Sequence, residues 1–146
     1  MNRRVVVTGM GIISCLGNDV DNFWKNVREG VCGLDRITEF PVDNLVVKIG
    51  GKIKNFHPED FGMDKPFIRK QDNFTLFAMA AAKQAMDDSG LKAGQNIDNY
   101  RLGVNVSSGI GGFSVTFREV AKMLETPSGE WVSPNFVPTT IPNIAA

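Results

Sequence analysis

The sequence lacks an excess of charge of either sign. Its 146 residues include 16 basic and 16 acidic side chains, which gives a formal net charge of zero. Binding to nucleic acid or to an anionic membrane draws on a surplus of positive charge. We therefore expect neither nucleic acid nor a membrane surface to be a partner.

Cysteine and histidine are scarce. Cys15 and Cys32 are the only cysteines and His57 is the only histidine, so neither a disulfide framework nor a zinc site with CxxC or HxxxH spacing can be built. We interpret His57 as an exposed loop residue and both cysteines as small buried hydrophobes. The sequence predicts no metal site and no cofactor, and it favours a reducing, cytoplasmic location.

Long hydrophobic runs are absent as well. No stretch approaches the roughly 20 apolar residues of a membrane span. Basic residues precede the valines at 5–7, as in a secretory leader, but Thr8, Gly9 and Gly11 interrupt the apolar core of roughly 7 to 15 residues that a leader needs. At 42% apolar and 22% charged residues, the chain has the composition of one ordinary domain or of part of a larger one.

The first regular element is predicted at residues 4–8, where consecutive valines indicate a strand buried on both faces. A glycine-rich loop follows at 9–17. Asn18 is the predicted cap of a helix that runs to about Glu29 and stops at Gly30. The order is thus strand, loop and helix.

The same order recurs later in the chain. A second apolar strand is predicted at 101–106, followed by a glycine loop at 107–112 and a helix with Val115 and Leu124 among its apolar positions. The clearest helical pattern lies between the repeats, at 72–89, and its alanines predict close approach to another helix or to a sheet. Alternating strands and helices favour an α/β architecture with a largely parallel sheet.

Two less regular segments carry weaker signals. Residues 45–53 predict a short strand interrupted by Gly50 and Gly51. Residues 141–146 predict the first turn of a further helix.

The glycine loops admit more than one interpretation. A strand followed by Gly9-x-Gly11 is typical of dinucleotide binding, in which glycines let the backbone approach a pyrophosphate at a helix N-terminus. The third small residue of that fingerprint falls on Ser14, and the helix begins only after Gly17, so nicotinamide or flavin binding stays an alternative. The loop at 107–112 lacks the Gly-Lys-Ser/Thr of a phosphate-binding loop. The plainer interpretation of both loops is tight turns and close backbone packing.

Four segments together resemble the β-ketoacyl-acyl carrier protein synthases, and most of all the type II elongating synthase. They are VVVTGMGIISCLGN at 5–18, QAMDDSGL at 84–91, SSGIGG at 107–112 and SPNFVPTTIPNIAA at 133–146, in family order. The resemblance implies a thiolase-like αβαβα sandwich, of which residues 1–146 form an incomplete N-terminal half. It also implies decarboxylative condensation of malonyl-acyl carrier protein with an acyl-enzyme thioester in fatty-acid elongation, by a protein that is a homodimer when full length.

The resemblance implies binding residues in this chain but no catalytic ones. Ile110 matches a residue at the base of the family's acyl pocket, and Phe136 matches a segment that lines the pocket across the dimer interface. The nucleophilic cysteine, two histidines and a lysine of the family lie beyond Ala146, and neither Cys15 nor Cys32 stands in for the nucleophile. We expect residues 1–146 alone to be inactive. A polyketide ketosynthase or its noncatalytic chain-length partner shares these motifs and stays an alternative.

Overall fold

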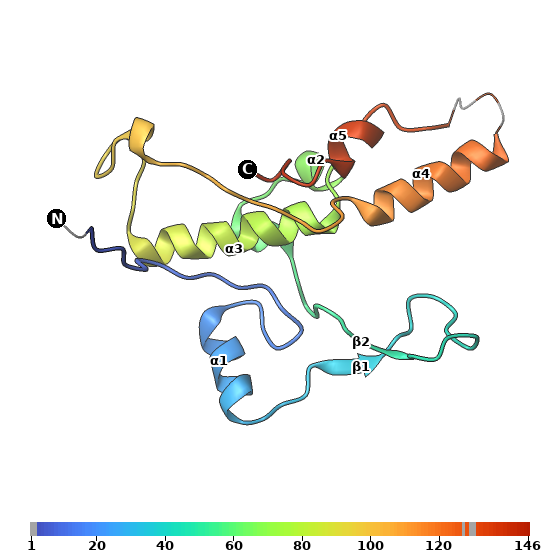
Figure 1. Cartoon of the computed structure of the whole chain (residues 1–146), viewed down its shortest axis with the longest axis horizontal. Helices are drawn as coiled ribbons and strands as arrows, with labels where there is room; N and C mark the ends of the chain where they lie inside the picture. Colours follow the sequence, from blue (N-terminus) through green and yellow to red (C-terminus); the bar gives the residue numbers. More distant parts are fainter. Residues whose placement is uncertain (1–2, 127, 129–130) are drawn as a thin grey trace. The chain divides into compact units, whose positions relative to one another are not determined.

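The structure is a computed structural model that describes residues 3–126, 128 and 131–146. The chain forms two compact units, the first made of Met1–His57 and Ala81–Gly90 and the second of Pro58–Ala80 and Leu91–Ala146. Helix α3 (Asn73–Ser89), 17 residues long, contributes its first half to the second unit and its last turns to the first (Figure 1).

The first unit begins with an extended segment rather than the predicted strand. The strand at 4–8 is wrong, because no described residue pairs with it and Val5 is 94% exposed. Backbone partners begin at Met10, whose N–H donates to Asp88 Oδ2 at 2.9 Å, and at Ile12, whose N–H donates to Gln84 Oε1 at 3.2 Å. Side chains of α3 thus bind the loop at 9–17, not the segment predicted as a strand.

Helix α1 (Val20–Arg28) confirms the predicted helix, with a correction at its cap. Asp19, not Asn18, is the N-cap, because its carboxylate accepts the N–H of Asn22 at 2.8 Å. That backbone hydrogen bond is the main reason why the pKa of Asp19 is lowered. Asn18 instead donates its amide to backbone carbonyls of the same unit. Gly30 ends the helix as predicted, with φ at 66°.

The described residues form one sheet, and it is antiparallel rather than parallel. Strands β1 (Leu34–Arg36) and β2 (Ile49–Gly51) pair with Leu34 opposite Gly51 (Figure 1). The prediction had glycines interrupting a strand at 45–53, whereas the structure keeps them inside β2. A Cβ on Gly51 would lie 3.1 Å from Cys15 Sγ, so the missing side chain lets the loop at 9–17 pack on the strand.

The second unit consists of helices and connecting segments. Besides the first half of α3, it contains η1 (Pro58–Phe61), α2 (Lys65–Ile68), η2 (Asn99–Arg101), α4 (Phe113–Glu125) and α5 (Phe136–Thr140). Helix α4 is confirmed, but the predicted strand at 101–106 is wrong, since no described residue pairs with it. The predicted helical turn at 141–146 is supported: after Ile141 ends α5, the N–H of Ile144 donates to the Ile141 carbonyl at 3.2 Å and that of Ala146 to the Asn143 carbonyl at 3.1 Å, so residues 142–145 form hydrogen-bonded turns.

Most described buried residues belong to the second unit. Met63, Leu76, Ala80 and Val115 are its buried apolar residues, and Asp72, Thr75, Glu119 and Thr139 are its buried polar ones. On α3 the fully buried positions differ from the predicted face, whose members are half-buried or, at Ala82, exposed. Because α3 carries apolar or small residues on most sides, its pattern predicts a helix but not which stripe is covered.

Candidate functional site

The glycine loop at 107–112 runs into α4 and lies against the end of α5. A Cβ on Gly111 would collide with the carbonyl oxygen of Thr140, and a Cβ on Gly112 with that of Thr139. The N–H of Gly112 donates to the Thr140 carbonyl at 3.4 Å. Gly111 also has φ at 74°, which favours glycine. These contacts confirm the plainer interpretation, in which the glycines serve close packing.

The two predicted acyl-pocket residues lie in these two adjoining segments. Ile110 is 69% exposed on the loop. Phe136 is half-buried at the start of α5, and its N–H donates to the Ser133 carbonyl at 2.9 Å. The buried hydroxyl of Thr139 closes this short helix by donating to the carbonyl of Asn135 at 2.8 Å. The role of Ile110 and Phe136 in a pocket stays a prediction.

A buried carboxylate holds the start of α4. Asp72 is 7% exposed, and its Oδ2 accepts the N–H of Val115 at 3.2 Å while its Oδ1 accepts the N–H of Phe74 at 3.4 Å. Gly112, the N-cap of α4, has no side chain, so Asp72 supplies the acceptor and the negative charge that a helix N-terminus favours. An acid at the start of α3 is a cap signal, but its second partner is 43 positions away and cannot be read from sequence.

A second buried acid ties α4 to the segment before α5. Glu119 is 1% exposed and accepts hydrogen bonds from the N–H of Ser133 at 2.8 Å, Lys122 Nζ at 3.0 Å and Arg118 Nε at 3.1 Å. The Ser133 N–H, followed by Lys122 and Arg118, lowers the pKa of Glu119 to about 2. Glu119 could not be recognised from sequence, because a charged residue in a helical pattern usually faces solvent.

The first glycine loop rests on the backbone of α3. A Cβ on Gly9 would collide with the carbonyl oxygen of Ala85, and a Cβ on Gly11 with that of Ala81. The close approach predicted from the alanines is confirmed, but the partner is a loop rather than another helix or a sheet. Gln84 fastens the loop further, because its Nε2 donates to the carbonyl of Asn18 at 2.7 Å. The helix occupies the space beside the glycines, which argues against a bound pyrophosphate there.

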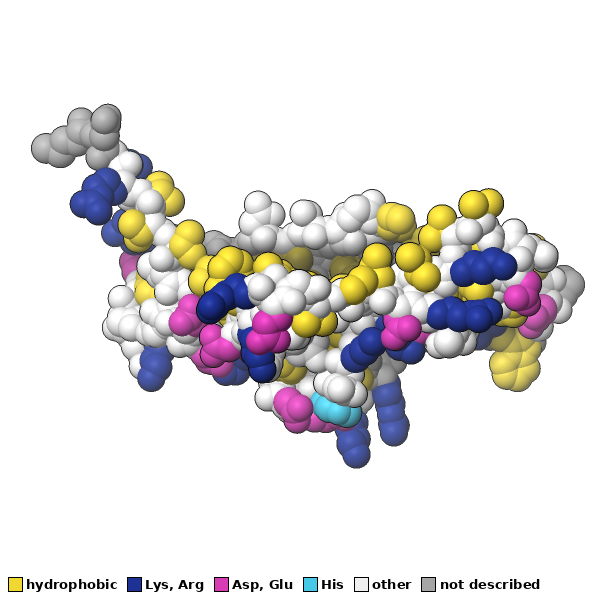
Figure 2. All heavy atoms as spheres, turned by 90° about the horizontal axis from the view of Figure 1, so that it is seen from below, with side chains coloured by type: hydrophobic (Ala, Val, Ile, Leu, Met, Phe, Trp, Pro, Cys, Tyr) yellow, Lys and Arg dark blue, Asp and Glu magenta, His cyan; other side chains and the backbone are white. Residues whose placement is uncertain are grey.

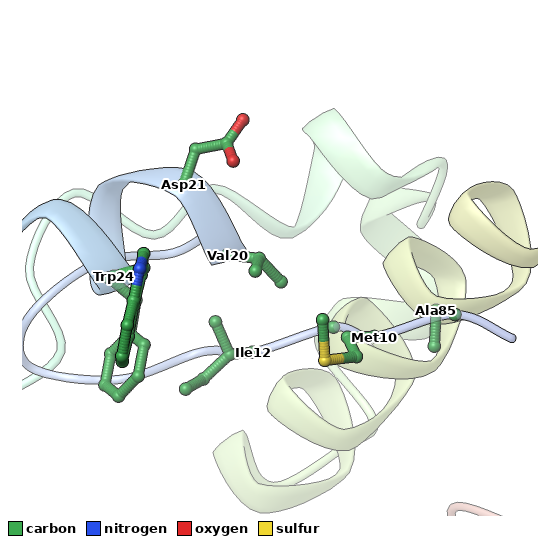
Figure 3. Close-up of a pocket in the computed structure, with 9 residues that line it drawn as sticks. Met10, Ile12, Val20, Asp21, Trp24 and Ala85 are labelled. Atoms are coloured by element: carbon green, nitrogen blue, oxygen red, sulfur yellow. The ribbon is translucent and has the colours of Figure 1, made fainter. Parts of the chain in front are cut away.

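An apolar cavity of about 760 Å³ adjoins the first loop. Its lining residues are Gly9, Met10, Gly11, Ile12, Val20, Asp21, Phe23, Trp24 and Ala85. Figure 3 shows Ile12, Val20 and Trp24 turned toward one another while the Asp21 carboxylate points away. With one acid and no cation among its lining residues, this wall suits an apolar group rather than a phosphate.

The cysteines and the histidine lie apart from these contacts. Cys15 is half-buried with its Sγ against Gly33, but Cys32 is exposed, so the prediction that both are buried is wrong for Cys32. Successive residues of an extended chain face opposite sides. Because Gly33 faces Cys15, the neighbouring Cys32 faces away from it and toward solvent. His57, cyan in Figure 2, is exposed as predicted.

The described part of the chain contains neither a metal-binding cluster nor a helix that could cross a membrane. Within it, no three or more His, Cys, Asp or Glu side chains are placed to hold a metal ion. None of its helices has the length and apolar character needed to cross a membrane.

Comparison with known proteins identifies the family. Residues 2–146 match the family model described as "Beta-ketoacyl synthase, N-terminal domain". The chain is 43% identical over 144 residues to 3-oxoacyl-(acyl-carrier-protein) synthase 2 of Staphylococcus aureus (strain COL) and 40% identical over 144 residues to that of Vibrio harveyi. Each alignment covers 99% of this chain and 34% of the relative. The chain therefore belongs to the β-ketoacyl synthase family and spans about a third of the length of these relatives.

Solved structures agree on the fold. A β-ketoacyl synthase from Burkholderia phymatum STM815 matches with a TM-score of 0.76 at 25% identity, over 99% of this chain and 35% of that one. AntDE:AntF, a type II PKS acyl-carrier protein in complex with its ketosynthase, matches with a TM-score of 0.77 at 24% identity, over 99% of this chain and 37% of that one. These similarities confirm the predicted α/β, thiolase-like fold class, of which this chain is a part.

Proposed function

We propose that this chain provides the N-terminal part of a condensing enzyme that elongates fatty acyl chains on acyl carrier protein. The observation that carries the proposal is the 43% identity to 3-oxoacyl-(acyl-carrier-protein) synthase 2 across 99% of the chain. In the proposed reaction an acyl group passes from a carrier thioester to an enzyme cysteine. Malonyl-acyl carrier protein then loses carbon dioxide, and the resulting carbanion attacks the acyl-enzyme, which releases the thiolate and forms 3-oxoacyl-acyl carrier protein.

Residues 1–146 contribute a binding surface to this reaction rather than its reacting groups. Ile110 and Phe136 are the proposed acyl-pocket residues, and the packing of the Ile110 loop on α5 supports a rigid wall. Acyl carrier protein is the proposed partner. We also propose a cytoplasmic location and a homodimeric enzyme.

A condensation assay tests the proposed activity. The native protein that contains this chain is incubated with acyl- and malonyl-acyl carrier protein, and 3-oxoacyl product and carbon dioxide are measured. We expect both products from the native protein and neither from residues 1–146 alone. Turnover by residues 1–146 that Cys15→Ala abolishes would show that the reacting groups are assigned wrongly.

The polyketide alternative is tested on the same protein. Polyketide ketosynthases appear among the solved structures, but at 24% identity they share only the fold. The residue at the family's nucleophile position separates the classes. A cysteine there agrees with a synthase, whereas another residue agrees with a noncatalytic chain-length partner.

The pocket assignment is tested by narrowing the pocket. Ile110→Phe should lower kcat/KM for long acyl substrates roughly 10- to 100-fold while short ones are spared, because hydrophobic pockets discriminate by about that factor. Val104→Phe is a matched control, since Val104 belongs to the same unit and is 66% exposed, close to the 69% of Ile110. Equal effects on all chain lengths would refute the pocket role of Ile110.

A further inference from the structure

The loop that carries Ile110 and the first turn of the helix that follows it are held by three contacts. Within the loop, the Ser108 hydroxyl accepts the N–H of Gly111 at 3.0 Å. Toward α5, the N–H of Gly112 donates to the Thr140 carbonyl. The third attachment is Asp72, which accepts the N–H of Val115 in the first turn of α4 and comes from the start of α3.

We infer that Asp72 is a positioning residue, which sets the shape of the acyl pocket by fixing α4 and, through it, the Ile110 loop. This inference rests on the proposed function, because the pocket itself is proposed. Ile110 and Val115 are five positions apart, so a displaced first turn of α4 moves the loop directly. The anchor is firm, because the α3 residues Leu76 and Ala80 that follow Asp72 are buried.

The chemistry of the contact requires a carboxylate. Asp72 is 7% exposed, and among the described residues no cation is paired with it in a salt bridge. Its negative charge is stabilised instead by hydrogen bonds from N–H groups at the starts of two helices. A carboxylate accepts on both oxygens at once, whereas the amide of asparagine has one accepting oxygen and an NH₂ group that can only donate. Asparagine of the same size therefore caps one helix and leaves the other uncapped.

Asp64 offers a matched control. It caps α2 in the same unit through a single contact, in which its Oδ1 accepts the N–H of Phe67 at 2.8 Å. Asparagine is about as good as aspartate in a single cap. Asp64→Asn should therefore change little, whereas Asp72→Asn removes one of two contacts.

The experiment compares these variants in the native protein by amide hydrogen exchange and by acyl-chain selectivity. We expect Asp72→Asn to speed exchange across residues 110–116 roughly tenfold, the effect of losing one cap. The ratio of kcat/KM for long and short acyl substrates should shift, while Asp64→Asn stays within about twofold of the parent. A purely structural role would lower activity at every chain length by one factor.

A second variant keeps the test decisive if Asp72→Asn does not fold. Val115→Pro removes the donor instead of the acceptor, at a first-turn position whose N–H has no partner within the helix. It should reproduce the shift in selectivity. If neither variant shifts selectivity while Ile110→Phe does, the positioning role is overturned and the pocket stands. If Ile110→Phe also has no selective effect, the pocket proposal fails, and unchanged exchange in Asp72→Asn would overturn the contact as an anchor.

Discussion

Replacing Gly112 with alanine tests whether the loop at 107–112 depends on close backbone packing. Gly112 has φ at −74° and ψ at 62°, the conformation of an inverse γ-turn, which does not require glycine, so the substitution changes occupied space rather than backbone conformation. Its new Cβ would lie closer than 3.0 Å to the Thr139 carbonyl oxygen and 3.1 Å from the Thr140 Cα, whereas ordinary contacts begin at 3.4 Å. Because these neighbours are backbone atoms, a rotamer change cannot relieve the overlap.

The expected loss of stability follows from two effects. Overpacking a closely packed site costs about 1–3 kcal/mol. Moving the loop from α5 also breaks the hydrogen bond from the Gly112 N–H to the Thr140 carbonyl, which adds about 1 kcal/mol. We expect the free energy of unfolding to fall by roughly 2–4 kcal/mol.

Gly109→Ala is the control within the same loop. A Cβ on Gly109 meets nothing within 4 Å, and its φ lies outside the range that favours glycine. It should leave stability unchanged or raise it by about 0.4–1 kcal/mol through the lower entropy of the unfolded chain. The assay is urea unfolding of the native protein and both variants. Equal midpoints for Gly112→Ala and Gly109→Ala would refute the packing argument.

Two further predictions concern the buried acid and the first loop. The pKa of Glu119 is lowered to about 2, so its stabilising contribution should be present above its ordinary pKa near 4.5 and be lost as the pH falls toward 2. Measured from pH 7 downward, the difference in free energy of unfolding between the parent and Glu119→Gln should therefore shrink over that interval. A difference that does not depend on pH would contradict the assignment. Gly11→Ala should lower the free energy of unfolding by about 1–3 kcal/mol, because its Cβ would collide with the Ala81 carbonyl oxygen, whereas Gly50→Ala, whose Cβ would make an ordinary 3.5 Å contact, should be nearly neutral.

The helices were predictable from sequence because their signals are local. Helices α1, α3 and α4 each combine a periodic apolar pattern with a start or stop residue nearby, and their bounds in the structure follow those signals closely. The error at the cap of α1 was a single position. Neighbouring Asn18 and Asp19 both favour caps, and only the hydrogen bond to Asn22 separates them.

The strands failed for the opposite reason, since a strand depends on partners that the local sequence does not contain. The valines at 5–7 are residue types typical of a buried strand. Among the described residues, however, no neighbouring strand forms backbone hydrogen bonds with this segment. Strand β1, in contrast, was not predicted at all. It forms because β2 meets it in register, although its residues Leu34–Arg36 carry little β preference.

The residues of the candidate site show the same difference between local signals and distant contacts. Ile110 and Phe136 could be named because they belong to short motifs that the family shares. Asp72 and Glu119 could not, because their importance comes from contacts with residues 43 and 14 positions away. Because both carboxylates are buried, they form hydrogen bonds that hold separate segments together instead of facing solvent as most acidic side chains do.

The two glycine loops show what decides between an anion site and a packing site. In both, a glycine lies beside carbonyl oxygens of a helix: those of α3 for Gly9 and Gly11, and those of α5 for Gly111 and Gly112. A phosphate site needs N–H groups pointing into open space. Carbonyl oxygens repel an anion, and here they lie where a Cβ on each of these glycines would be placed. Each loop is therefore suited to close packing against a helix rather than to binding a phosphate.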